Sequence, residues 1–283
     1  MAFALDRRGR RSVANGAFIA ACTTATGLAL VFLVAILVSL LINGVGGVNL
    51  DVFLKSTPAP GSSGGLANAI VGSLMMCAVA MVLAVVVGIL AGTWLAEFAR
   101  DSVYGKVVRF TNDVLLSAPS ILVGLFVYSF LVRPFHGFSG IAGSVALALL
   151  AAPVVTRTTE DVLKLQSRQL RESGVALGAP VWTAIRAILW RSAAGGIITG
   201  GLLAFARISG ETAPLLFTAL NNQFFSLDMT QPIANLPTII FNYALSAYDD
   251  WRRLAWVGAL LITIAVLGAN VVVRALAREK KRP

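Results

Sequence analysis

The sequence predicts an all-α integral membrane protein, a bundle of six transmembrane helices. Of its 283 residues, 57% are hydrophobic and only 13% are charged, whereas a soluble globular domain is about a quarter charged. Apolar runs of about 20 residues recur along the chain. Each is long enough to cross the roughly 30 Å hydrocarbon core of a bilayer.

The first apolar run covers residues 17–42 and follows a basic N-terminal segment, residues 1–16, which contains RRGRR. A signal peptide has an apolar core of only about 7–15 residues with a cleavage site of small residues behind it. The run at 17–42 is longer and leads into NGVGGVN. We therefore interpret it as a retained first span, followed by an external linker at 43–66 that is rich in Gly, Pro and Ser.

The other five spans are expected to form a core at residues 67–274. They are 67–95, 111–132, 138–155, 194–219 and 254–274. The two longest connections, 156–193 and 220–253, are expected to hold the functional loops. Small residues recur at helix-packing spacing in two spans, where they let backbones approach closely within the chain or against another subunit. These pairs are Gly88/Gly92 and Gly196/Gly200.

Lysine and arginine are distributed unevenly between the two sides of the predicted bundle. If the N-terminus is cytoplasmic, 18 of these residues lie on the inside and 4 on the outside. The positive-inside rule then places both termini, including a basic tail at 275–283, and the loop 156–193 in the cytoplasm. The segment 220–253 is external. The net charge of +10 needs no nucleic acid to explain it, because the basic residues flank several spans instead of forming one patch.

The sequence shows no chemistry for catalysis. It has one histidine, His136 in a short turn, and two cysteines in apolar runs, Cys22 and Cys77. Cysteines in such runs are usually small buried hydrophobic side chains. We find no cluster of ligating residues with metal-site spacing and no Gly-rich phosphate loop. We therefore predict no catalytic residue, no metal and no cofactor.

The cytoplasmic connection 156–193 is predicted to contain a short helix–turn–helix. Its first helix would have N-caps at Thr156–Thr159, with Glu160 and Asp161 near the positive end of the helix dipole. Three helix breakers follow, and after them an amphipathic segment at 181–190. The breakers are Gly174, Gly178 and Pro180. An exposed segment with so few residues for its own core is suited to docking into a groove on another protein, and an ordinary long loop is the alternative.

The segment ESGVALGAP at 172–180 resembles the EAA loop of ABC importer permeases, whose pattern is E-A-A-x-x-x-G. Glu172 and Gly178 match that pattern, whereas Ser173 and Gly174 replace the two alanines. The segment also falls between spans four and five, on the side that the charge distribution assigns to the cytoplasm. In that family the loop forms a coupling helix in a cleft of the ATPase subunit. The resemblance implies coupling residues Glu172, Ser173, Gly174, Gly178, Ala179 and Pro180.

Longer strings are similar to the permease subunits of phosphate-specific ABC importers. They are LLSAPSILVGLF (115–126), LALLAAPVVTRTTEDVLKL (147–165), RISGETAPLLFTAL (207–220) and DMTQPIANLPTIIF (228–241). The likeness covers about residues 65–280. It implies a type I ABC importer (MetI-like) permease fold in the bacterial cytoplasmic (inner) membrane and ATP-driven import of inorganic phosphate.

The resemblance also implies partners. They are a PstC-like second permease subunit in a heterodimer, two copies of a cytoplasmic ATP-binding subunit, an extracytoplasmic phosphate-binding protein and membrane lipids. ATP hydrolysis would take place on the separate subunits, so this chain is expected to be a transport subunit and not an enzyme. The external segment 220–253 is expected to help receive the phosphate-binding protein.

Two charges interrupt the fifth span. On a continuous helix Arg207 and Glu211 share a face with Gly210 and Pro214, and Thr212 adds a hydroxyl. A lone charge at mid-span costs about 2.5–3.5 kcal/mol on insertion scales, so we expect this stripe to face the bundle interior or a watery pathway. Pro214 cannot donate to the Gly210 carbonyl, which predicts a kink.

Two interpretations of this stripe stay open. Arg207 and Glu211 form a static ion pair that fixes the register of the spans, or they line the translocation pathway, which we favour. In a pathway, Arg207 binds a phosphate oxygen while Glu211 accepts a hydrogen bond from a protonated one, or the pair opens and closes during transport. Arg157 and Glu160 are weaker pathway candidates, for which helix capping and surface charge are the favoured explanation.

Two rival functions remain. Another oxyanion ABC permease, for sulfate or molybdate, would differ in which anion competes for uptake. An ATPase-independent channel or secondary carrier would keep its transport without an ATPase partner, and changes at Glu172 and Gly178 would not affect it.

Overall fold

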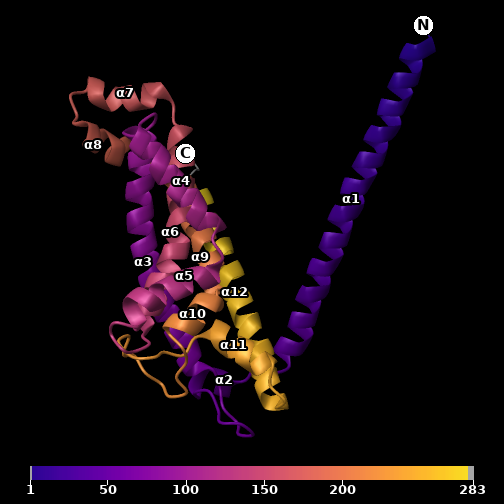
Figure 1. Ribbon diagram of the computed structural model, residues 1–283, viewed down its shortest axis with the longest axis vertical. Helices are drawn as coiled ribbons and strands as arrows, with labels where there is room; N and C mark the ends of the chain where they lie inside the picture. The colour runs from indigo at the N-terminus through magenta and orange to yellow at the C-terminus, as the bar shows by residue number, and fades with distance from the viewer. Residues whose placement is uncertain (1, 280–283) are drawn as a thin grey trace.

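The computed structural model describes residues 2–279, and every regular element within them is a helix (Figure 1), which confirms the all-α prediction. The predicted basic tail extends to residues 280–283, which lie outside the described residues. The five long helices are α1 (Ala2–Val45), α3 (Ala67–Glu97), α6 (Gly140–Lys164), α9 (Trp190–Ser209) and α12 (Asp249–Glu279). The shorter elements are α2 (Leu50–Leu54), α4 (Val103–Ser117), α5 (Ser120–Val127), η1 (Tyr128–Val132), α7 (Arg168–Ala176), α8 (Val181–Ala184), η2 (Ile185–Leu189), α10 (Ala213–Thr218) and α11 (Leu236–Ala244).

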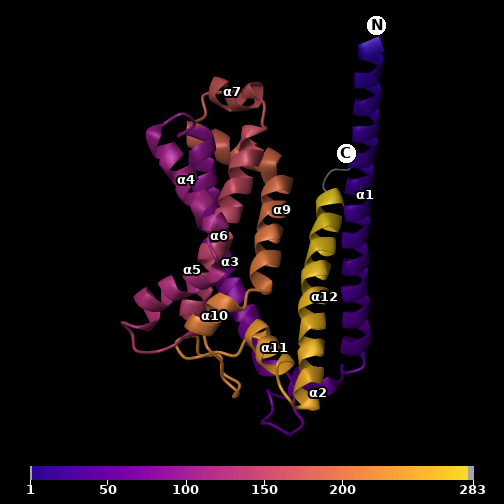
Figure 2. The ribbon, with the colours of Figure 1, turned by 45° about the vertical axis from the view of Figure 1, so that its right-hand side comes forward.

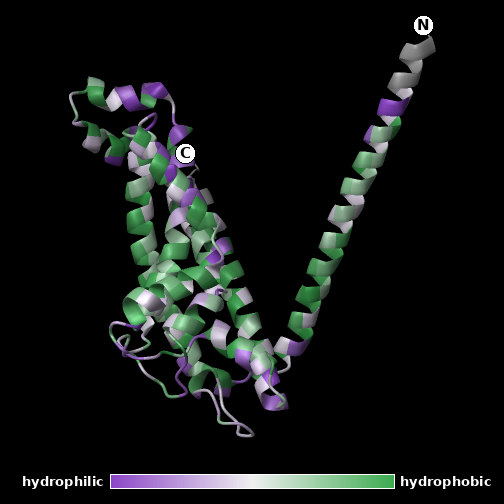
Figure 3. Cartoon of the chain, viewed as in Figure 1, coloured by the Kyte–Doolittle hydropathy of each residue, from purple (hydrophilic) through white to green (hydrophobic). Residues whose placement is uncertain are grey.

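Among the described residues, five helical segments are long and apolar enough to cross a membrane, and a bent pair makes a sixth candidate. Hydrophobic residues cover the long helices between the two ends of the bundle (Figure 3). The five segments are Gly9–Val45, Ala67–Glu97, Gly140–Lys164, Val181–Ser209 and Asp249–Val272. The predicted number of six spans is therefore reached when the bent pair counts as one.

The bent pair corrects the third predicted span, 111–132. The helix begins earlier, at Val103, and α4 meets the following helix at an angle of 106°. Pro119 explains the break, because it disfavours the helical conformation of the residue before it. Ala118 accordingly has φ −64° and ψ 135°, and α5 begins after Pro119.

Helix α6 lies at the centre of the bundle. In its most apolar window 72% of the residues are buried, against 22% in the windows of α3, α9 and α12. Glycines bring its neighbours close: a Cβ at Gly92 of α3 would lie 2.6 Å from the Thr156 carbonyl oxygen, and one at Gly196 of α9 would lie 2.5 Å from Val162. Gly88 and Gly200 make similar approaches to α6, which confirms the predicted role of these small residues in packing.

The two ends of the bundle differ. Helix α7 lies at one end, toward which the start of α1 and the last turns of α12 also point, and α2 and α11 lie at the other (Figures 1 and 2). We call these the α7 end and the α11 end. Helix α1 meets α12 near the α11 end, where Gly44 abuts Leu260, and then stands away from the bundle (Figure 1).

Candidate functional site

The charged stretch of the fifth span lies in a helix break, which corrects the predicted continuous span 194–219. Helix α9 ends at Ser209, three residues follow, and α10 begins at Ala213. Pro214 stands in the first turn of α10, where its missing N–H costs no helical hydrogen bond. The expected kink inside one helix is therefore a full break, because a new helix begins around the proline.

The break also changes the predicted stripe. Arg207 lies in the last turn of α9, whereas Glu211 and Thr212 lie in the break, so the three do not share one helical face. Arg207 and Glu211 are both half-buried. Among the side chains that the structure describes, neither has an ion-pair or hydrogen-bond partner, so the direct pair considered from the sequence is not formed here.

Packing around the break is tight on one side and open on the other. A Cβ added at Gly124 of α5 would lie 2.7 Å from the Cα of Pro214, so the two backbones are in contact. Gly210 is exposed, and a Cβ there would meet nothing within 4 Å. The break thus presents one guanidinium, one carboxylate and the Thr212 hydroxyl beside a firmly held α10.

The segment after α10 is bonded back onto the start of α6. The Ser139 amide donates to the Thr218 carbonyl at 3.0 Å, and the Gly140 amide donates to the Gln231 carbonyl at 3.1 Å. A turn at Asp228 precedes this contact, and hydrogen bonds from the Thr230 hydroxyl and amide lower the pKa of the Asp228 carboxyl. The loop therefore fixes α10 from the α11 end.

The predicted coupling residues lie in the loop of α7 and α8, which projects from the bundle (Figure 2). Glu172 and Ser173 are exposed, but Gly174 is buried, because a Cβ there would lie 2.7 Å from the Cβ of Ala184. The prediction that Gly174 breaks the helix is therefore wrong. Gly174 lies inside α7 and packs it against α8. The break occurs at Gly178, whose φ of +77° favours glycine, and Ala179 and Pro180 lead into α8.

Exposed apolar side chains surround these coupling residues. Val175, Leu177, Val181 and Trp182 are 50%, 87%, 52% and 46% exposed. Apolar surface of this kind at the tip of a loop marks an interaction site. The sequence showed only that 181–190 is amphipathic. It did not show that the apolar side chains of α7 and α8 would gather on one projecting loop.

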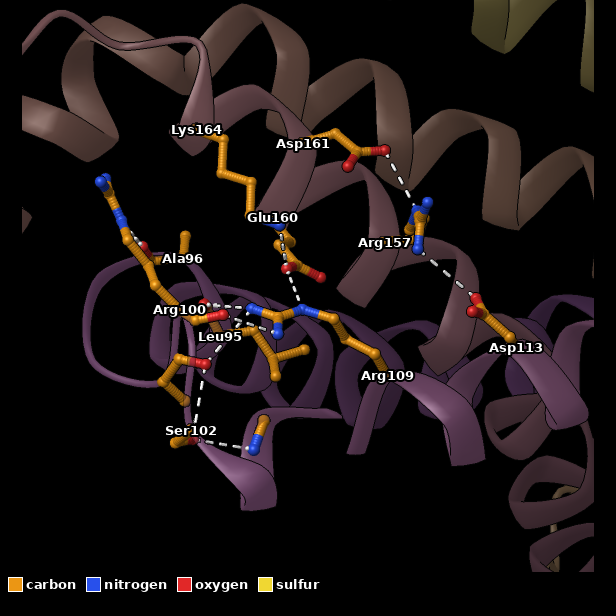
Figure 4. A network of polar contacts seen from close by, with 12 residues as sticks. Leu95, Ala96, Arg100, Ser102, Arg109, Asp113, Arg157, Glu160, Asp161 and Lys164 are labelled. Atoms are coloured by element: carbon orange, nitrogen blue, oxygen red, sulfur yellow. Dashed lines mark hydrogen bonds and ion pairs between the residues drawn. The ribbon is translucent and has the colours of Figure 1, made fainter. Parts of the chain in front are cut away.

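Glu160 has a different place from the one predicted. Helix α6 continues to Lys164, so Thr156–Thr159 lie inside it and cap nothing. The hydroxyls of Thr156 and Thr158 donate to carbonyls one turn earlier, whereas the buried Thr159 hydroxyl has no partner among the described residues. Only 2% of the Glu160 side chain is exposed, so helix capping and surface charge are both wrong. Its Oε1 accepts from Arg109 Nε at 2.6 Å and from Lys164 Nζ at 2.5 Å (Figure 4).

Arg109 extends this network to the turn between α3 and α4. Its guanidinium also donates to the carbonyls of Leu95 at 2.9 Å and Arg100 at 3.0 Å (Figure 4). Arg157 lies apart from the network. It is half exposed and pairs with Asp113 at 3.5 Å and with Asp161 at 3.3 Å.

A membrane-spanning helix bundle around one central helix, with a helical loop projecting from one end, is the architecture of a polytopic membrane protein. Residues 88–282 match the family described as "Binding-protein-dependent transport system inner membrane component". The chain therefore belongs to this family of ABC importer permeases and is a multi-pass inner-membrane protein. The family description makes it a membrane component of a transport system.

Curated relatives match over most of their length. The chain is 51% identical over 254 residues to the phosphate transport system permease protein PstA of Haemophilus influenzae, covering 90% of each protein. It is 52% identical to PstA of Yersinia pestis, with 89% of this chain and 86% of the relative covered. The probable PstA of Methanocaldococcus jannaschii is 35% identical, with 75% and 76% covered.

The fold has a solved counterpart. A chain of the MetNI methionine ABC transporter, in an inward-facing conformation, superposes with a TM-score of 0.64 at 19% identity. The match covers 76% of this chain and 95% of that one. It confirms the type I (MetI-like) permease fold expected from the sequence.

Proposed function

We propose that this chain is the transmembrane permease subunit of an ATP-driven importer of inorganic phosphate. The observation that carries this proposal is an identity of about half to named PstA permeases over roughly 90% of the chain. The subunit lies in the bacterial cytoplasmic membrane with both termini and the α7 end in the cytoplasm. The 18 to 4 distribution of lysine and arginine supports this orientation.

The assembly that we propose supplies what this chain lacks. A PstC-like second permease completes the pathway, two copies of an ATP-binding subunit hydrolyse ATP, and an extracytoplasmic phosphate-binding protein delivers phosphate at the α11 end. Glu172 and the exposed apolar side chains of the α7–α8 loop dock on the ATPase. Apolar side chains at a projecting loop are suited to a groove on a partner.

We propose the α9–α10 break as the part of the pathway that phosphate passes. Arg207 can bind a phosphate oxygen with two N–H groups, and Glu211 can accept a hydrogen bond from a protonated phosphate oxygen. Both charges are half-buried and have no partner among the described side chains, which is costly unless a ligand, water or the second permease compensates. Thr212, Gly210 and Pro214 shape the opening beside them.

The test is phosphate uptake by the complete transporter reconstituted in vesicles. Arg207→Lys keeps the charge but loses the planar fork, so uptake should fall about tenfold or more while the ATPase subunit still co-purifies. Arg168→Lys, an exposed arginine on α7, serves as the matched control. Normal uptake in Arg207→Lys and in Arg207→Gln/Glu211→Gln would exclude these residues from the pathway. Uptake that persists without any ATPase subunit, or that sulfate or molybdate abolishes by competition, would refute the assigned function.

A further inference from the structure

Arg171 and its neighbour Glu172 differ in burial on α7. Glu172 is exposed. The Arg171 side chain is only 16% exposed, because it lies against the helix bundle. Glu172 is thus open to a partner, whereas Arg171 is bonded to the spans.

The Arg171 guanidinium joins three helices. Its Nε donates to both carboxylate oxygens of Glu97, the last residue of α3, at 3.1 Å each. Its Nη1 and Nη2 donate to the carbonyl oxygens of Gln166 and Leu163, both at 2.5 Å. Leu163 lies in the last turn of α6 and Gln166 in the turn that follows it, so α3, α6 and α7 meet on a single side chain.

Each of these partners needs a cation at this position. The C-terminal end of a helix carries partial negative charge and carbonyl groups without intrahelical donors. Glu97 adds a full negative charge to such an end, and its side chain is only 10% exposed. A planar guanidinium can satisfy the carboxylate and both carbonyls at once, which a lysine ammonium cannot do in the same geometry.

The other attachments of α7 are covalent or apolar. The turn 165–167 joins it to α6, and Gly174 packs on Ala184 of α8, which continues through η2 into α9 along the chain. Leu170 joins an apolar cluster that includes Ile185 and Leu189 of η2, and also Ala96 of α3 and Leu163 of α6. Arg171 is therefore the hydrogen-bonded link from α7 to α3 and α6, which themselves pack closely through Gly88 and Gly92.

We propose that Arg171 and Glu97 form the joint through which movement of the α7–α8 loop shifts α3 and α6 together with α9. Arg171 is a positioning residue, since its side-chain hydrogen bonds go to Glu97, Gln166 and Leu163 and none goes to the α9–α10 break. The inference rests on the proposed docking of this loop on an ATPase subunit. Without the joint, a push on α7 would still reach α6 and α9 along the chain, but it would reach α3 only through the small apolar cluster at Ala96.

The experiment compares phosphate uptake with ATP hydrolysis in the same vesicles, using the complete transporter. Glu97→Gln and Arg171→Lys should each lower the phosphate taken up per ATP hydrolysed by about fivefold or more. The double variant should be no worse than Arg171→Lys alone, because both changes break one joint. Asp101→Asn is the matched control: it removes an exposed carboxylate four residues beyond Glu97 and should leave the ratio unchanged.

Co-purification of the ATP-binding subunit separates this inference from the proposed function. The joint predicts that the subunit stays bound in both variants while the ratio falls. An unchanged ratio would overturn the inference, and so would loss of the ATP-binding subunit, since the pair would then only hold the docking surface in shape. If the Arg171→Lys chain does not fold into the membrane at all, the Glu97→Gln variant decides the question by itself. A wild-type chain that retains no ATP-binding subunit would instead refute the proposed function.

Discussion

The buried carboxylate of Glu160 gives a prediction whose size follows from its surroundings. Removing one partner of a buried ion pair typically costs about 3–5 kcal/mol, because the other charge loses its counter-ion. In Glu160→Gln the stranded charge is Arg109, which is 18% exposed and keeps its hydrogen bonds to backbone carbonyls. We therefore expect a loss at or just below the lower end of that range, about 2–3 kcal/mol in the free energy of unfolding.

The other two members of the network serve as comparisons. Lys164 is 43% exposed, so Lys164→Gln should cost less than about 1 kcal/mol, as surface pairs do. Arg109→Gln should cost at least as much as Glu160→Gln, because it also leaves the carbonyls of Leu95 and Arg100 without a donor. The double variant Arg109→Gln/Glu160→Gln should show a coupling energy above about 1 kcal/mol.

The assay is reversible unfolding of the purified chain in mixed detergent micelles, with each free energy measured against the wild type. A Glu160→Gln variant within about 0.5 kcal/mol of the wild type would refute the reasoning. If that stable variant also lost phosphate uptake, Glu160 would belong to the pathway and not to the scaffold.

Two further predictions concern packing and a buried amide. Gly92→Ala should destabilise the bundle by about 1–3 kcal/mol, because the new methyl would lie 2.6 Å from the Thr156 carbonyl oxygen. Gly201→Ala is the control in the same unfolding assay and should be neutral, because a Cβ there would have nothing within 4 Å. Equal effects of the two substitutions would contradict the packing argument. Asn68→Ala removes side-chain bonds to the Thr57 hydroxyl and the Asn222 carbonyl, both 2.9 Å long. Hydrogen exchange around residues 221–223 should then quicken while that of α6 stays unchanged, and protection equal to the wild type would show that the amide does not hold these loops together.

The sequence predicts spans better than it predicts where they bend. Hydropathy does not distinguish a straight helix from the pair α4 and α5, because a 106° turn at Pro119 leaves the apolar composition unchanged. The same holds at Gly210, where the prediction of a kinked helix failed because α10 starts a new helix around Pro214. A proline marks both places, Pro119 and Pro214, but does not show the extent of the change.

A local sequence pattern cannot show which side chains will pair when the two partners lie far apart in the sequence. Glu160 was interpreted as a residue near a helix start, because the end of α6 could not be located without its packing. Its partner Arg109 is 51 positions away, and Arg171 and Glu97 are 74 apart. The EAA-like segment, in contrast, was recognisable because its pattern lies within one short stretch, Glu172–Gly178.

The isolated position of α1 has a consequence for how the chain can be divided. Its contact with the rest lies near Gly44 and Leu260, whereas the buried apolar clusters draw their residues from position 52 onward. Helix α1 is therefore a separable module that is joined to the rest through one short contact lined by glycine. The remaining spans make the packing contacts that stabilise a helix bundle among themselves.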